Sequence, residues 1–198
     1  YHTRAAKRGN QSAHVIADLP FMSYQASVEE GMRNAGRVMK EAGAQAVKLE
    51  GGEPVVPLVE KLTRTGIPVC AHLGLTPQSV HKFGGYRVQG RGERADELLE
   101  DAKKLEDAGA YMLVLEMVPS ELAERMTDEL SIPTIGIGAG RKTSGQVLVL
   151  QDLLGMNSDF EPKFLKTFAD LESTVVEALQ SYASDVRERA FPADEHSY

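Results

Sequence analysis

The sequence predicts an α/β domain of the (β/α)₈ barrel class, the TIM barrel, in which parallel strands alternate with helices. Short apolar runs of strand length alternate with helical patterns along the chain. Most of these runs are continuously apolar, as expected of parallel strands that are covered on both faces. Polar side chains stand at the carboxyl ends of successive runs, which is where a barrel assembles its site.

Six segments are expected to form strands because each is a short apolar run bounded by turn residues. They are HVIADLP (14–20), QAVKLEGG (45–52), IPVCAHLG (67–74), YMLVLEMV (111–118), IPTIGIGAG (132–140) and QVLVLQD (146–152).

Helices are expected between these strands because polar and apolar residues there follow a helical period. Ser27 and Glu30 predict a capping box at the start of the first full helix, and Gly43 marks its end. The expected helices cover residues 28–43, 54–65, 94–108, 120–130 and 162–190, and residues 1–9 are expected to form the last part of another.

A doubly wound sheet is the alternative architecture, since it would hold six strands in 198 residues without difficulty. A complete barrel needs eight strands and about 250 residues. A doubly wound sheet gathers its chemistry near one switch point, however, whereas here the polar strand ends are distributed over consecutive strands. We therefore expect one barrel domain over residues 1–198 that lacks its first strands, with residues 191–198 as a flexible tail.

The composition excludes some classes of function. The net charge of −7 and the absence of a basic stripe argue against nucleic-acid binding. No apolar run is long enough for a transmembrane helix and no signal peptide is visible, so we expect no membrane partner and a cytoplasmic location. The single cysteine, Cys70, is expected to be a buried thiol, with a catalytic thiol near His72 as the alternative.

Five candidate site residues stand at the carboxyl ends of four successive strands. They are Asp18, Lys48, Glu50, His72 and Glu116. Asp18 and Glu50 offer hard oxygen ligands that suit Mg²⁺, and no cysteine or histidine spacing supports zinc. Lys48 shares a strand face with Glu50 and could bind a substrate carboxylate, or it could simply brace the barrel mouth in an ion pair.

Glu116 ends a very apolar strand, where partial desolvation would suit a general base. Its alternative role is an acid at a helix N-terminus. His72 could hydrogen-bond a substrate or be a satisfied structural histidine.

Two glycine-rich segments have weaker predictions. His81 and the loop at 83–92 could close over a ligand or form a flexible connection. GIGAG at 136–140 partly matches a dinucleotide fingerprint but lacks the third glycine, so we interpret it as a tight turn.

Several motifs together resemble the ketopantoate hydroxymethyltransferase (3-methyl-2-oxobutanoate hydroxymethyltransferase) family. They are ADLPFMSY (17–24), VKLEGG (47–52), HLGLTPQS (72–79), GGYRVQGR (84–91), LEMVP (115–119), IGIGAG (135–140) and GQVLVLQDLLG (145–155). The resemblance extends from the first residue to about Ser158.

This resemblance implies a barrel of the phosphoenolpyruvate/pyruvate superfamily that is cytoplasmic, Mg²⁺-dependent and homo-oligomeric, often a decamer. It further implies transfer of a hydroxymethyl group from the co-substrate 5,10-methylenetetrahydrofolate to 3-methyl-2-oxobutanoate. The product would be 2-dehydropantoate, in the first committed step of pantothenate and coenzyme A biosynthesis.

The resemblance also implies a role for individual residues. Asp18 would ligate Mg²⁺ and contact the oxo acid, Lys48 would bind substrate, Glu50 would be the second acidic metal residue, and Glu116 would accept the proton. The family has a further Asp-Ser pair on an early strand that would precede Tyr1, so we expect one metal ligand to be missing from this chain.

Two other functions stay open from the residues. Lys48 could act as a Schiff-base nucleophile in aldol chemistry. The chain could instead be an inactive scaffold that packs with partners through its long C-terminal helix.

Overall fold

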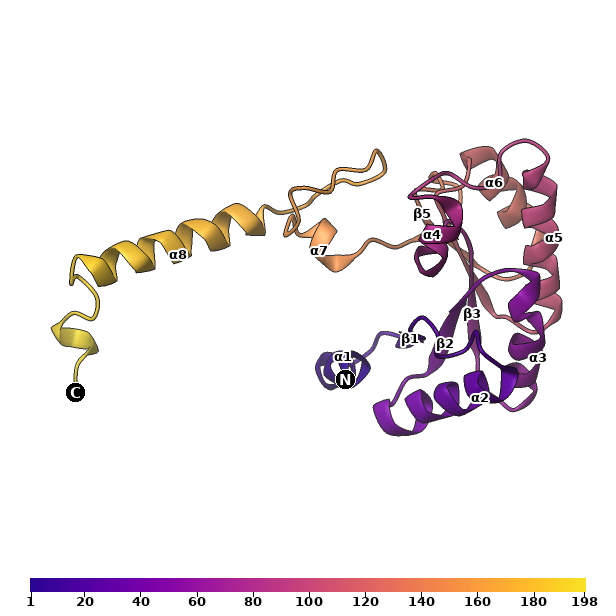
Figure 1. The fold of residues 1–198 in the computed structure, drawn as a ribbon, viewed down its shortest axis with the longest axis horizontal. Coiled ribbons are helices and arrows are strands. Elements are labelled where there is room, and N and C mark those ends of the chain that lie inside the picture. The colour runs from indigo at the N-terminus through magenta and orange to yellow at the C-terminus, as the bar shows by residue number, and fades with distance from the viewer. The chain divides into compact units, whose positions relative to one another are not determined.

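In a computed structural model, which describes residues 1–198, six parallel strands form one sheet in the order of the sequence (Figure 1). They are β1 (Ile16–Asp18), β2 (Ala46–Glu50), β3 (Val69–Gly74), β4 (Met112–Glu116), β5 (Thr134–Ile137) and β6 (Gly145–Gln146). A doubly wound sheet reverses its strand order at a switch point, whereas this sheet never does. The order is that of a (β/α) barrel, so the predicted fold class is confirmed.

The longer helices alternate with the strands, as expected. They are α1 (His2–Gly9), α2 (Val28–Arg37), α3 (Val56–Arg64), α4 (Val80–Phe83), α5 (Arg94–Asp107), α6 (Ser120–Glu129), α7 (Leu150–Leu153) and α8 (Leu171–Arg187). A π-helical turn, η1 (Val38–Ala42), extends α2, and the 3₁₀ turns are η2 (Glu53–Val55), η3 (Pro77–Ser79) and η4 (Asp194–His196). No helix is both long enough and apolar enough to cross a membrane.

The start and end of the first predicted helix follow the capping chemistry of its sequence. The Ser27 hydroxyl oxygen accepts a hydrogen bond from the backbone N–H of Glu30 at 3.1 Å. Gly43 ends the helical segment with φ of 74°, a conformation that glycine adopts without steric cost. Ser27 thus sets where the helix begins, and Gly43 sets where the chain leaves it towards β2.

The two faces of each strand have different surroundings. Odd-numbered side chains of β2 to β4 pack in the hydrophobic core, where Figure 1 shows α2, α3, α5 and α6 along one side of the sheet. These core side chains are Val47, Leu49, Val69, Ala71, Leu73, Leu113 and Leu115. Because neighbouring residues in a strand face opposite sides, the even-numbered residues point away from these helices. The predicted site residues are all even-numbered.

The chain divides into two compact units, residues 1–147 and 148–198. The first contains the whole sheet and its helices α1 to α6. The second contains α7, α8 and η4.

The predicted strand at 146–152 is wrong beyond its first residue. Only Gly145 and Gln146 pair with β5, and residues 150–153 form α7. Val147, which follows the last paired residue, is 43% exposed, so its β-branched side chain is not covered by neighbouring side chains as in a packed strand.

The predicted helix at 162–190 begins later than expected. The Asp170 carboxylate accepts a hydrogen bond from the N–H of Ser173 at 3.2 Å and so caps α8 at its start. Phe168, which lies within the predicted range, precedes α8 and is exposed. The apolar side chains of α8 itself are at least partly exposed, and none is buried.

Candidate functional site

The five predicted site residues meet at the carboxyl ends of β1 to β4. Strand pairing sets Asp18 beside Lys48 and Glu50 beside His72. Gly74 is paired with Glu116 in the same way, so Glu116 lies one step further along the staggered sheet. The distances between their side-chain atoms join all five into one cluster.

Lys48 occupies the centre of this cluster. Its Nζ atom lies 2.9 Å from Asp18 Oδ1, 3.1 Å from His72 Nδ1 and 3.6 Å from Glu50 Oε1. An ammonium group has three hydrogens to donate and no lone pair, so Nδ1 of His72 must be the acceptor. The hydrogen-bond network therefore assigns the neutral tautomer with its proton on Nε2.

His72 connects Lys48 to Glu116. Its Nε2 atom lies 3.1 Å from Glu116 Oε2, close enough for a hydrogen bond, yet Nε2 has no partner once the direction of the N–H is considered. A misaligned N–H donates only weakly, so the short distance does not make a hydrogen bond. His72 is 3% exposed and thus holds a buried donor that is free to align when a substrate binds.

The two predicted metal residues differ in exposure. The Asp18 side chain is 55% exposed, whereas Glu50 is only 8% exposed. A buried carboxylate needs hydrogen-bond partners to offset its lost hydration, and the N–H of Gln78 donates to Glu50 Oε2 at 2.9 Å. Glu50 Oε1 is the oxygen that faces Lys48.

The donor set fits magnesium. Mg²⁺ in proteins commonly takes one or two carboxylates and completes its shell with water and substrate oxygens. Asp18 and Glu50, which flank Lys48, could supply that pair. No group of three or more His, Cys, Asp or Glu side chains is arranged to hold a metal.

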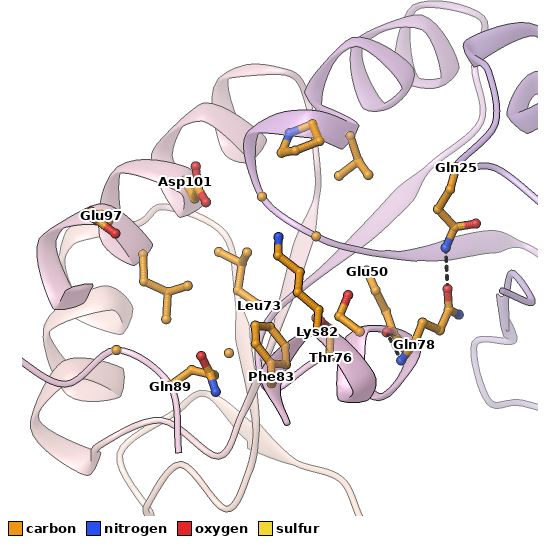
Figure 2. Close-up of a pocket in the computed structure, with 18 of the residues that line it drawn as sticks. Gln25, Glu50, Leu73, Thr76, Gln78, Lys82, Phe83, Gln89, Glu97 and Asp101 are labelled. Carbon is orange, nitrogen blue, oxygen red and sulfur yellow. Dashed lines mark hydrogen bonds between the residues drawn. The ribbon is translucent and has the colours of Figure 1, made fainter. Parts of the chain in front are cut away.

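A pocket of about 660 Å³ lies beside Glu50 (Figure 2). Residues of the β1–α2, β2–η2, β3–α4 and α4–α5 connections and of α4 and α5 line it, including the amides of Gln25, Gln78 and Gln89 and the aromatic ring of Phe83. Its volume is in the range of pockets that bind small ligands.

Burial affects two other titratable groups near the cluster. Burial raises the pKa of the Cys70 thiol to about 11, which argues against the alternative of a catalytic thiolate. Burial also raises the pKa of the Tyr24 hydroxyl, so this group keeps its proton and can donate.

The two glycine-rich segments have defined positions. The N–H of Gln89, in the 83–92 loop, donates to the carbonyl of Met117 at 3.0 Å, so the loop is fastened next to Glu116. Gly138 and Gly140 have φ of 63° and 81°, and a side chain on Gly140 would collide with Ser120. Gly136 and Ile137 complete β5, and the last three residues of GIGAG form the turn that we expected.

Two residues of the site were not identified from the sequence. Tyr24 and Gln78 both contact Glu50, from the β1–α2 and β3–α4 connections. They lie inside the ADLPFMSY and HLGLTPQS motifs, but a lone tyrosine or glutamine in a loop gives no chemical signal of its own.

Comparison with known proteins points to one family. Residues 1–194 match a family model described as ketopantoate hydroxymethyltransferase. Two relatives named 3-methyl-2-oxobutanoate hydroxymethyltransferase are those of Syntrophus aciditrophicus, 55% identical over 199 residues, and of Clostridium botulinum, 53% identical over 199 residues. The chain is covered completely in both alignments, which span 73% and 72% of the two relatives.

Solved structures support the fold. A 2,3-dimethylmalate lyase of the PEP mutase/isocitrate lyase superfamily matches 99% of this chain and 68% of its own, with a TM-score of 0.52 and 16% identity. A phosphoenolpyruvate phosphomutase from Streptomyces platensis matches 90% of this chain and 63% of its own, with a TM-score of 0.52 and 13% identity. At these identities the likeness concerns the barrel architecture alone.

Proposed function

The chain belongs to the ketopantoate hydroxymethyltransferase family, and we propose that its five-residue cluster transfers a hydroxymethyl group to 3-methyl-2-oxobutanoate. The observation that carries this proposal is the continuous contact from Asp18 and Glu50 through Lys48 and His72 to Glu116. It brings a cation, two potential metal ligands and a carboxylate that could act as a base into one cluster, which is the set that an oxo acid with a removable proton requires.

Lys48 binds the carboxylate of the oxo acid in this proposal. Its ammonium group already faces oxygen atoms of Asp18 and Glu50, and the substrate carboxylate would compete for the same hydrogens. Lysine acts here as a compact point charge rather than as a two-pronged clamp. The Nε2–H of His72 is a second donor, free to align with a substrate oxygen or with Glu116.

Asp18 and Glu50 would hold Mg²⁺. When bound, the metal polarises the keto group of the substrate and so makes the adjacent C–H more acidic.

Glu116 is the base. We propose that its carboxylate removes the single proton on C3, and that the electron pair of that C–H bond passes into the enolate of the oxo acid. The Glu116 side chain is 14% exposed, so water is largely excluded from the carboxylate that must accept the proton.

The one-carbon donor is 5,10-methylenetetrahydrofolate in this proposal. Water adds to the methylene carbon of the donor and both of its carbon–nitrogen bonds break, which releases formaldehyde and tetrahydrofolate. The enolate carbon then attacks the formaldehyde carbon, and the resulting alkoxide takes back the proton held by Glu116, so the balanced products are 2-dehydropantoate and tetrahydrofolate. The pocket beside Glu50 is our proposed entry site for the donor, because its amides and aromatic ring suit a flat, polar heterocycle.

A cytoplasmic location and a homo-oligomer, as large as a decamer, are also part of the proposal. Both rest on the family resemblance alone.

The proposal is tested by proton NMR of 3-methyl-2-oxobutanoate in D₂O, with the protein, with and without Mg²⁺, and without folate. We expect Mg²⁺-dependent loss of the C3 proton signal in the unmodified protein and none with Glu116→Gln. Adding 5,10-methylenetetrahydrofolate should then give 2-dehydropantoate. Exchange that persists with Glu116→Gln would show that another group is the base.

A further inference from the structure

The Glu50 carboxylate is held on two sides. Its Oε1 atom lies 3.6 Å from Lys48 Nζ and 3.8 Å from His72 Nδ1, while Oε2 accepts the hydrogen bond from the N–H of Gln78. Turning the carboxylate plane would break the bond to the backbone N–H of Gln78. The orientation of the Glu50 carboxylate is therefore set in part by a group outside the cluster.

The Gln78 side chain is fixed by three hydrogen bonds. Its Nε2 donates to the carbonyl of Leu19 at 2.8 Å. Its Oε1 accepts from the Tyr24 hydroxyl at 2.8 Å and from Gln25 Nε2 at 2.7 Å. Figure 2 shows Gln78 between Gln25 and Glu50, bonded to both.

Tyr24 closes this network. Its hydroxyl accepts a hydrogen bond from the backbone N–H of Glu50 at 2.9 Å and donates to Gln78, and the residue is 3% exposed. One buried oxygen atom therefore joins the end of β2 to the connection that follows β3. Together with Leu19 and Gln25, the network links the end of β2 to the connections after β1 and β3.

We propose that Tyr24 and Gln78 are positioning residues that hold the Glu50 carboxylate with Oε1 directed at Lys48 and His72. This inference rests on the proposed function, because Glu50 matters to catalysis only if the cluster is the site. Neither residue needs to touch the oxo acid. Their effect would come through Glu50. Removal of a group that orients a metal-ligating side chain typically changes metal affinity or activity about 10- to 100-fold.

Tyr24→Phe tests the inference because it removes one oxygen atom and keeps the ring that fills the core. We expect the rate of C3 proton exchange to fall about 10- to 100-fold, and Mg²⁺ affinity, titrated by calorimetry with the metal alone, to weaken with it. Gln78→Ala should have the same direction of effect. Exchange and Mg²⁺ affinity that equal those of the unmodified protein in both variants would overturn the inference.

Tyr111→Phe is the matched control. It also removes a phenolic oxygen, one whose hydrogen bond goes to His14 Nε2 at 2.8 Å, just before β4 begins and so at the other end of the sheet. We expect its exchange rate to equal that of the unmodified protein.

A double-mutant cycle separates positioning from simple destabilisation. If Tyr24 acts through Glu50, Tyr24→Phe should reduce exchange much less in a Glu50→Gln background than in the unmodified protein. An equal loss in both backgrounds would overturn the inference, even if the loss is large. Absence of exchange in the unmodified protein would refute the proposed function instead, so the two failures are distinguishable.

Discussion

The Nε2 atom of His72 lies 3.1 Å from Oε2 of Glu116, on the neighbouring strand, without an aligned hydrogen bond between them. The other ring nitrogen contacts Lys48 at 3.1 Å. One imidazole ring thus spans the distance between the proposed substrate-binding cation and the proposed base. This relationship makes His72 the residue whose replacement is most informative.

His72→Asn should slow C3 exchange about 10- to 100-fold. The shorter amide can still accept a hydrogen bond from Lys48, but it cannot reach Glu116. His72→Gln is longer and should recover part of the rate. Both rates can be read from the same NMR assay, and a His72→Asn rate equal to that of the unmodified protein would make the histidine structural.

Removal of the metal with EDTA should stop C3 exchange, and added Mg²⁺ should restore it.

Lys48 should form no covalent adduct when the protein and the oxo acid are treated with borohydride. Its ammonium group lies against hydrogen-bond acceptors of Asp18, Glu50 and His72, and an ammonium nitrogen has no lone pair with which to attack a carbonyl. Intact-mass measurement checks this point. A mass increase at Lys48 together with resistance to EDTA would favour the Schiff-base alternative.

Cys70 should resist alkylation in the folded protein at about pH 8, because its thiol is buried and its pKa is raised to about 11. The folded protein binds this proton more tightly than the unfolded chain does, so the stability contribution is complete below the unfolded pKa of about 9. It is lost as the pH rises towards 11. Mass spectrometry after iodoacetamide treatment, with a guanidinium-denatured sample as control, measures the protection.

Cys70→Ala should retain most of the exchange activity. Loss of activity in a folded variant would revive the catalytic thiol.

Gly74→Ala should destabilise the protein by about 2–3 kcal/mol. Gly74 has φ of 94°, and a Cβ atom there would overlap the backbone oxygen of Glu116. The strand end that carries the proposed base would have to shift, so exchange should fall as well. Denaturant unfolding and the NMR assay measure the two effects.

Gly36→Ala is the control for that substitution. Gly36 lies in α2 with no atom within 4 Å of the added Cβ, so alanine should raise the unfolding free energy by about 0.5–1 kcal/mol. A similar loss of stability in both variants would contradict the steric explanation for Gly74.

The barrel and its cluster could be predicted because their signals are local in the sequence. Continuous apolar runs predicted β2, β3 and β4. An acid or a histidine at an even-numbered position near the end of each run predicted the site residues. Parallel pairing then brings those ends together without any further information. Asp18, at the end of the short strand β1, follows the same rule.

The remaining features depend on contacts that one segment cannot encode. Residues 146–152 have strong β propensity, yet that propensity reflects packing against neighbours, and Val147 remains 43% exposed at the end of the sheet. The roles of Tyr24 and Gln78 depend on hydrogen bonds between residues 26 to 59 positions apart in the sequence. No sequence motif at Tyr24 or Gln78 indicates these hydrogen-bond partners.

The alternation along β2 to β4 places the leucines and the reactive residues on the same strands but on opposite faces. A slip of one residue in the pairing of any strand would turn its charged groups into the core and its leucines out of it. A chain that misplaced a site carboxylate in this way would also lack a stable hydrophobic core. Correct packing of the core therefore ensures correct placement of the site residues. Molecules with a slipped strand would be lost to aggregation or proteolysis and would not accumulate as folded but inactive enzyme.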